Sequence, residues 1–133
     1  MNHKRKKPDL INTRLHGMLD YSSAVILLLP WITGFYPTAA DTLALTILGG
    51  LTILFSILTD YEFGLIKLLP MKVHLVLDTI SALFLISMPF TFTIIHYQYN
   101  WPVVLGVFEL LVVILSGSQP YRVRASETQI GKP

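Results

Sequence analysis

Two pairs of ionisable residues recur in this sequence with the same internal spacing. His16 and Asp20 are four residues apart, and so are His74 and Asp78, so on a helix each pair shares one face. Each pair opens a long apolar tract, where an unpartnered ionisable side chain is unfavourable by roughly a few kcal/mol or more. The four side chains are therefore predicted to form one polar cluster.

Three kinds of chemistry suit this cluster. In a structural arrangement, Asp20 and Asp78 interact with the positive ends of helix dipoles or cap those ends, and the histidines bond carboxylates of neighbouring helices. Alternatively, all four residues bind a divalent metal such as zinc, for which imidazole and carboxylate are suitable ligands. In the third arrangement, His16 and His74 are the axial ligands of a haem held between two helices.

Glu109 is a separate candidate, since it falls near the middle of the last apolar tract. A carboxylate in this position either bonds a neighbouring hydroxyl, such as that of Thr52 or Ser56, or takes part in proton coupling. Proton- or ion-coupled transport is therefore a further functional class for this chain. Gly106 on the same segment would allow the close helix approach that such a bond requires.

A second polar group lies between the two histidine segments. Asp60 and Glu62 precede Lys67 and Lys72, and together they are predicted to form a salt-bridged cap in which the lysines, or Arg14, compensate Asp60. The lysines are also suited to phosphate or lipid headgroups.

The distribution of basic residues predicts the elements that position these side chains. No Lys or Arg occurs between Arg14 and Lys67, nor between Lys72 and Arg122. A membrane span needs about 20 apolar residues, so each tract holds two spans and a turn. The fold class is therefore an all-α, polytopic membrane protein with four transmembrane helices in two tandem hairpins, predicted at residues 17–36, 42–59, 74–95 and 101–116.

All ten basic residues lie in the two tails and the central connector, which the positive-inside rule assigns to the cytoplasm. The predicted segments are a basic tail (1–14), a first hairpin (15–66), a connector (67–73), a second hairpin (74–117) and a C-terminal tail (118–133). The basic run at residues 4–7 would contact anionic lipid headgroups. An aromatic belt is predicted at the opposite interface from Trp31, Tyr36, Tyr97, Tyr99 and Trp101.

The two hairpins repeat each other in sequence. After each His–Asp pair comes an apolar run that ends in Pro30-Trp31 or in Pro89-Phe90. In the second helix of each hairpin, Leu48-Gly49 corresponds to Leu105-Gly106, and Ile57-Leu58-Thr59 corresponds to Ile114-Leu115-Ser116. Both halves begin on the same side, so the repeat is parallel, with its axis along the membrane normal. Pro30 and Pro89 are predicted to kink their helices, with Trp31 and Phe90 at the outer interface; a gating hinge is the alternative.

These segments resemble the SPW repeat family of small bacterial integral membrane proteins. The resemblance rests on LPWITGF at 29–35, MPF at 88–90 and TDYEFGLIKLLPMKVHLVLD at 59–78, and it covers about residues 15–117. Leu29 stands where the family name has serine, and the second repeat reads SMPF at 87–90. The resemblance implies a multi-pass protein of the bacterial inner membrane, with both termini cytoplasmic, and it implies no particular activity.

Composition excludes several other classes. Charged residues make up 14% of the chain, against about 25% in soluble domains. The net charge is only +2 and the basic residues form no stripe with aromatics, which excludes nucleic-acid binding. The chain has no cysteine, no glycine-rich phosphate loop and no metalloprotease motif. We therefore expect a non-enzymatic membrane component whose polar cluster is structural or binds a small ligand. The alternative is a metal- or haem-dependent membrane redox protein or enzyme that uses His16, Asp20, His74 and Asp78. The short chain leaves room for a homo-oligomer.

Overall fold

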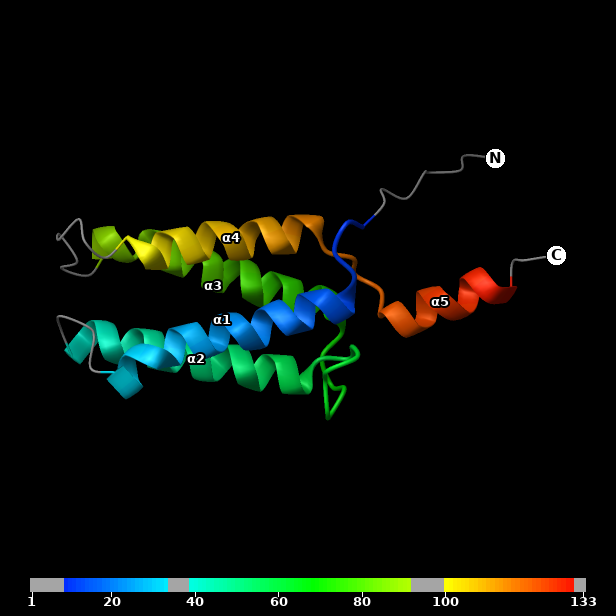
Figure 1. Ribbon diagram of the computed structural model, residues 1–133, viewed down its shortest axis with the longest axis horizontal. Helices are drawn as coiled ribbons and strands as arrows, with labels where there is room; N and C mark the ends of the chain where they lie inside the picture. The colour runs from blue at the N-terminus through cyan, green and yellow to red at the C-terminus, as the bar shows by residue number, and fades with distance from the viewer. Residues whose placement is uncertain (1–8, 34–38, 92–99, 131–133) are drawn as a thin grey trace.

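The computed structural model describes residues 9–33, 39–91 and 100–130, and the described residues form five helices. These are α1 (Thr13–Thr33), α2 (Ala39–Leu58), α3 (Met71–Thr91), α4 (Trp101–Leu115) and α5 (Tyr121–Ile130). Helices α1 to α4 lie side by side along the molecule, and α5 lies beyond one end of them (Figure 1). The predicted all-α fold and its two helical hairpins, α1–α2 and α3–α4, are confirmed.

Helices α1, α2 and α3 begin three or four residues earlier than the apolar runs used to predict them, whereas α4 begins at the predicted residue. Helix α1 begins at Thr13 because the side-chain oxygen of Asn12 accepts the N–H of Leu15 at 2.8 Å, an N-terminal cap that the apolar pattern does not report. Helix α3 begins directly after Pro70, whose carbonyl accepts the N–H of His74 at 3.2 Å. Helix α5 was not predicted, because its sequence, YRVRASETQI, is mostly polar and contains no apolar run.

In each hairpin, one glycine allows the two helices to pack close together. A Cβ on Gly49 would lie 3.0 Å from the Leu27 Cβ and 3.2 Å from the Ala24 carbonyl oxygen. A Cβ on Gly106 would lie only 2.7 Å from the Ala82 carbonyl oxygen. The same repeat positions therefore make the α1–α2 and the α3–α4 contacts, as the sequence repeat predicts.

Substituting Gly106 with alanine should separate α3 from α4, because the added methyl group meets a backbone oxygen that cannot move aside. We expect a loss of about 1 to 3 kcal/mol in the free energy of unfolding, typical of overpacking. The matched control is Gly50→Ala, where nothing lies within 4 Å of the added Cβ; there the higher helix propensity of alanine should stabilise by up to about 1 kcal/mol. Denaturation in mild detergent measures the stability of both variants. An equal effect of the two substitutions would contradict the close contact between Gly106 and α3.

At one end of the bundle, short backbone pairings tie the helix ends together. The N–H of Ile11, before α1, bonds the carbonyl of Leu115 at 3.0 Å, and the N–H of Gly117 bonds the carbonyl of Ile11 at 3.0 Å. Correspondingly, the N–H of Asp60, after α2, bonds the carbonyl of Leu69, before α3, at 2.8 Å. Thr59 and Ser116 are thereby held beside the first turns of α3 and α1.

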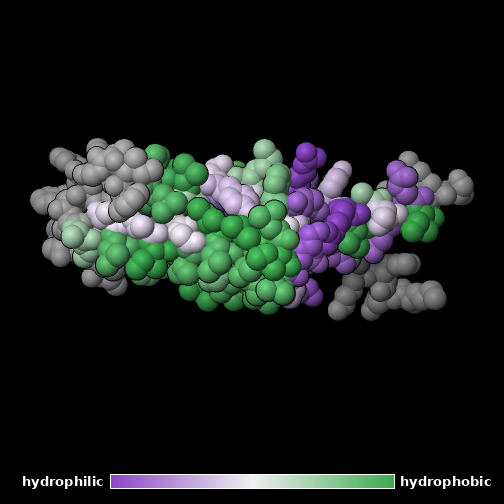
Figure 2. All heavy atoms as spheres, turned by 90° about the horizontal axis from the view of Figure 1, so that it is seen from below, coloured by the Kyte–Doolittle hydropathy of each residue, from purple (hydrophilic) through white to green (hydrophobic). Residues whose placement is uncertain are grey.

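The outer surface of the helices is strongly apolar. Large side chains such as Val25, Leu43, Val76, Leu83 and Val104 are exposed, and Figure 2 shows hydrophobic residues over the helices, with hydrophilic residues gathered toward one end. Helices α2 and α3 are each long and apolar enough to cross a membrane, while α4 is equally apolar but only 15 residues long. Helix α1 carries His16, Asp20 and two serines in its first half and does not reach that threshold.

The residues predicted to kink and anchor the helices are described only in part. Helices α1 and α3 continue past Pro30 and Pro89, and Phe90 is exposed. The side chain of Trp31 and the residues Tyr36, Tyr97 and Tyr99 lie outside the described part of the chain. Of the predicted aromatic belt, Trp101 is described, and it packs against the apolar core formed by Leu27, Leu45, Leu48, Leu85 and Met88.

Candidate metal centre

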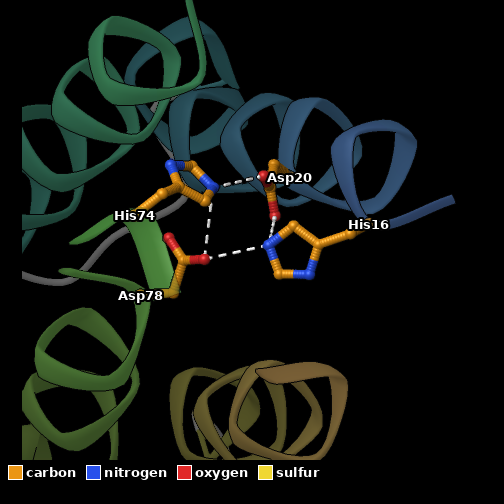
Figure 3. Close-up of side chains that lie close together, drawn as sticks. All are labelled: His16, Asp20, His74 and Asp78. Carbon is orange, nitrogen blue, oxygen red and sulfur yellow. Dashed lines mark hydrogen bonds and ion pairs between the residues drawn. The ribbon is translucent and has the colours of Figure 1, made fainter. Parts of the chain in front are cut away.

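The two His–Asp pairs meet in the interior, between α1 and α3. His16 and Asp20 come from α1, His74 and Asp78 come from α3, and none of the four is more than 6% exposed. Figure 3 shows both imidazole rings and both carboxylates directed toward a common centre. The sequence prediction that these residues converge is confirmed; we call them the His/Asp quartet.

Each histidine contacts both aspartates through its Nε2 atom. The shorter contacts cross between the helices: His74 Nε2 lies 2.8 Å from Asp20 Oδ2, and His16 Nε2 lies 3.0 Å from Asp78 Oδ2. The contacts within a helix are longer, at 3.3 Å from His16 to Asp20 and 3.2 Å from His74 to Asp78. The quartet therefore joins the two hairpins.

The other ring nitrogen of each histidine is bonded to a hydroxyl of the opposite hairpin. His16 Nδ1 lies 2.7 Å from Ser116 Oγ, and His74 Nδ1 lies 2.9 Å from Thr59 Oγ1. Ser116 donates its only hydroxyl proton to the Val112 carbonyl at 2.6 Å. The Thr59 hydroxyl donates in the same way to the Phe55 carbonyl at 2.6 Å. In this arrangement both hydroxyls accept from the imidazoles, and each Nδ1 carries a proton.

Thr59 and Ser116 are site residues that the sequence prediction did not include. They fix the rotation of each imidazole, so that Nε2 faces the centre of the quartet. The signal for them was in the sequence, since Ile57-Leu58-Thr59 and Ile114-Leu115-Ser116 are matching segments of the repeat. Their role depends on the helix ends being tied together, which no pattern along one helix reports.

The quartet is balanced in charge when it holds no ion. Each Nε2 lies at hydrogen-bond distance from carboxylate oxygens and donates a proton to them where they are ionised. With Nδ1 also protonated, both rings are then imidazolium cations, and the two carboxylates neutralise them. This balance explains how four ionisable groups are accommodated in one buried place.

The same four residues have the chemistry and spacing of a zinc site. Zinc bound tetrahedrally at 2.0–2.1 Å has ligand atoms about 3.3 Å apart. One atom from each residue of the quartet can be chosen so that all lie within 4.8 Å of one another, and the four nitrogen–oxygen contacts measure 2.8 to 3.3 Å. A divalent cation that replaced the two Nε2 protons would leave the charge of the site unchanged.

Haem does not suit this arrangement. The rings of His16 and His74 lie edge to face with their centroids 5.4 Å apart, and both Nε2 atoms contact the same oxygen of Asp78. The carboxylates thus occupy the space that a porphyrin between two axial histidines would need. The geometry of the quartet therefore does not support the haem alternative.

Tyr61 covers one side of the quartet. Its ring is fully buried and stacks on the His74 ring at a centroid distance of 5.8 Å. The ring fits against α1 only because residue 17 is glycine, since a Cβ there would lie 2.1 Å from Tyr61 Cε2. Burial raises the pKa of Tyr61 far above its ordinary value, so the side chain stays neutral and adds no charge to the site.

Glu109 is buried in α4, at 8% exposure, and lies within electrostatic range of Asp78 and Asp20. Its Oε2 atom has no hydrogen-bond partner among the described residues. The predicted bonds to hydroxyls of α2 are wrong: Thr52 donates to the Leu48 carbonyl at 3.0 Å, and Ser56 donates to Asp20 Oδ2 at 3.5 Å. Each hydroxyl is turned toward its own helix or toward the quartet instead.

The predicted salt-bridged cap forms with a different cation. Asp60 pairs with Arg122 of α5, whereas within the described residues Lys67, Lys72 and Arg14 have no acidic partner. The prediction that these cations compensate Asp60 is wrong because α5, which was not predicted, places its first turn beside the end of α2. Arg124 of α5 likewise pairs with Asp9.

Glu62 anchors the N-terminal end of α5. Its carboxylate accepts the Thr13 hydroxyl at 2.6 Å and the N–H of Arg122 at 3.0 Å, and the N–H of Tyr121 bonds the Thr13 hydroxyl at 2.8 Å. Partial burial opposes ionisation, but the hydrogen bonds from Thr13 and from the α5 backbone outweigh it and hold the pKa of Glu62 below its ordinary value.

Acidification should therefore release α5. A carboxylate with a lowered pKa in the folded state stabilises fully above its ordinary pKa of 4.5, and this stabilisation is lost as the pH falls through the lower folded value. Hydrogen exchange of the Tyr121 and Arg122 amides should show protection above 4.5 that is lost in acid. Glu62→Gln should weaken that protection at neutral pH, while Glu127→Gln on the exposed side of α5 should not. Equal protection in both variants would contradict the anchoring role.

No family model, curated protein or solved structure matches this chain.

Proposed function

We propose that this chain is a four-span membrane protein that binds one divalent cation of the zinc class in the His/Asp quartet. The observation that carries the proposal is the convergence of two imidazole nitrogens and two carboxylate oxygens within 4.8 Å. Imidazole with carboxylate is a usual ligand set for zinc, and facing helices of a bundle are a usual place for it. The fixed Nδ1–H groups support the proposal, because metal-binding histidines are held in this way.

The distribution of polar and apolar side chains supports the membrane assignment. Its interior holds the quartet, Glu109 and several hydroxyls, while its surface carries valine, leucine and isoleucine. A soluble protein rarely exposes so continuous an apolar surface, whereas polar groups facing the bundle interior are typical of membrane helices. We assign α1 to α4 as the four spans, with the ends that carry the quartet in the cytoplasm, as the basic residues favour.

We also propose that the chain is an inner-membrane member of the SPW repeat family. The repeated Pro-aromatic segments and the connector support this assignment. The equivalent packing of Gly49 and Gly106 agrees with two copies of one hairpin related by the repeat. The assignment brings no known activity with it, so the function rests on the quartet.

The number of protein ligands favours binding over catalysis. Catalytic zinc sites keep one position open for water or substrate, while structural sites fill all four positions with protein atoms. The quartet supplies four ligand residues and is closed from solvent. We therefore propose that the cation clamps the α1–α2 and α3–α4 hairpins together, and that the protein is not a hydrolase.

Metal analysis of protein purified in mild detergent tests the proposal. After stripping with a chelator and adding zinc, the unmodified chain should retain one ion per chain, and His74→Ala should retain none. Asp78→Asn, which preserves the shape of the side chain, should also lose the ion. Asp60→Asn is the matched control, since Asp60 pairs with Arg122 outside the quartet. Equal zinc retention by all four proteins would overturn the assignment.

Glu109 favours a second candidate function, proton- or ion-coupled transport. A buried carboxylate with an unpartnered oxygen deep in a membrane bundle is a typical coupling group. In vesicles, Glu109→Gln should abolish cation flux driven by a pH gradient while leaving zinc retention in the quartet intact. Unchanged flux in this variant would exclude the role.

A further inference from the structure

The segment between α2 and α3, residues 59–70, is a fixed loop with apolar side chains on its outside. Its backbone is tied to the end of α2, since Leu65 N–H bonds the Ile57 carbonyl at 2.8 Å and Leu68 N–H bonds the Leu58 carbonyl at 2.8 Å. Yet the side chains of Leu65 and Leu68 are 78% and 70% exposed, and Ile66 between them is also exposed. The loop thus has a defined shape and presents leucine and isoleucine to the outside.

Basic side chains accompany this apolar surface. Lys67 lies between Ile66 and Leu68 and adopts a left-handed backbone with φ of 54°, a conformation uncommon for residues other than glycine. Lys72 follows in the first turn of α3 and is exposed. The nearby acids are engaged elsewhere, Asp60 with Arg122 and Glu62 with Thr13. Within the part of the chain that the structure describes, neither lysine has an acidic partner, so the loop carries uncompensated positive charge.

The loop is placed where a membrane interface would be. In Figure 1 the green segment between α2 and α3 projects sideways from the end of the bundle. A sideways projection at helix ends directs side chains into the zone where lipid headgroups meet acyl chains. Apolar residues that enter this zone, with lysines extending toward phosphate groups, are the general features of interfacial binding.

We propose that this loop and the first turn of α3 form a binding site for anionic phospholipid, with Leu65, Ile66 and Leu68 in the acyl boundary and Lys67 and Lys72 on the phosphate. The inference rests on the proposed membrane location and is independent of the metal site. Each lysine near an anionic surface contributes about fivefold in affinity, so the pair should give a preference on the order of tenfold or more for anionic over zwitterionic lipid.

The absence of cysteine from the chain makes single-cysteine labelling a direct test. The protein is reconstituted in nanodiscs of phosphatidylcholine with or without phosphatidylglycerol, and an environment-sensitive fluorophore is attached at Leu65→Cys, at Leu83→Cys on the outer face of α3, or at Glu127→Cys on α5. We expect the probe at 65 to be quenched by lipids carrying a quencher near the headgroup and shielded from iodide. The probe at 127 should behave in the opposite way.

Lipid preference is measured on the same nanodiscs by native mass spectrometry of the released protein. Lys67→Gln with Lys72→Gln should lower the retention of phosphatidylglycerol by about tenfold relative to phosphatidylcholine, and Lys67→Arg with Lys72→Arg should retain it. Equal retention in both double variants would overturn the lipid assignment. If the probe at 65 is shielded from iodide only when a nanodisc holds two copies of the protein, the lipid assignment is also wrong, and the loop is a self-association surface.

The probe at 83 separates this inference from the membrane proposal on which it rests. If the probe at 83 is shielded by lipid and the probe at 65 is open to iodide, the loop inference fails while the membrane assignment stands. If both probes are open to iodide, the membrane assignment itself fails.

Discussion

Replacing His74 with leucine should lower the free energy of unfolding of the metal-free protein by about 3 to 5 kcal/mol. The substitution removes one of two imidazolium groups and leaves Asp20 and Asp78, both buried, facing the single cation of His16. The loss should thus come mainly from an uncompensated buried charge rather than from lost contacts. Denaturation in mild detergent, with chelator present, gives the measurement.

The quadruple leucine variant is the informative comparison. When His16, Asp20, His74 and Asp78 are all replaced, no buried charge remains at the quartet, and stability should return to that of the unmodified chain or exceed it. The ion pair between Asp60 and Arg122 is the comparison for a surface interaction, since its side chains are 40% and 44% exposed. Asp60→Asn should therefore change the free energy of unfolding by at most about 1 kcal/mol. A His74→Leu effect no larger than this would mean that the quartet is not a compensated ionic cluster.

The hairpins were predictable because they follow from properties that each segment carries alone. Apolar length and the distribution of basic residues predict where helices lie and which ends meet on the same side. To predict that His16 and Asp78 converge, one further observation was needed: the sequence repeat, which places both His–Asp pairs at the same depth along the helices. Helix ends were predicted less well, since a single capping group such as Asn12 decides where α1 begins.

The cross-hairpin partners could not be predicted from the spacing of residues. Four residues between His16 and Asp20 predict a shared face, yet the shorter contact of His16 is to Asp78, and its other nitrogen bonds Ser116. These choices depend on how the hairpins meet and on the pairing of Ile11 with the end of α4. The prediction that a lysine or Arg14 compensates Asp60 failed for a similar reason. Asp60 pairs with Arg122 of α5, a helix that the apolar pattern does not reveal.

Zinc binding to the quartet should release two protons per ion. The hydroxyls of Thr59 and Ser116 already donate to backbone carbonyls, so both Nδ1 protons stay in place. The proton on each Nε2 must leave before the nitrogen can bind a metal. While the metal-free quartet keeps both of these protons, affinity for zinc should rise about 100-fold for each unit increase in pH.

Titration calorimetry in buffers with different ionisation enthalpies counts the released protons directly. The expected count is two for the unmodified chain and two for Asp60→Asn, whose carboxylate lies outside the quartet. Replacing Ser116 with alanine removes the acceptor of the His16 Nδ1 proton, so affinity should fall while the count remains two, because the alanine removes no ligand. A count of one in the unmodified chain would mean that one histidine already presents a bare Nε2 to the carboxylates. The electroneutral exchange of two protons for one divalent ion would then be wrong.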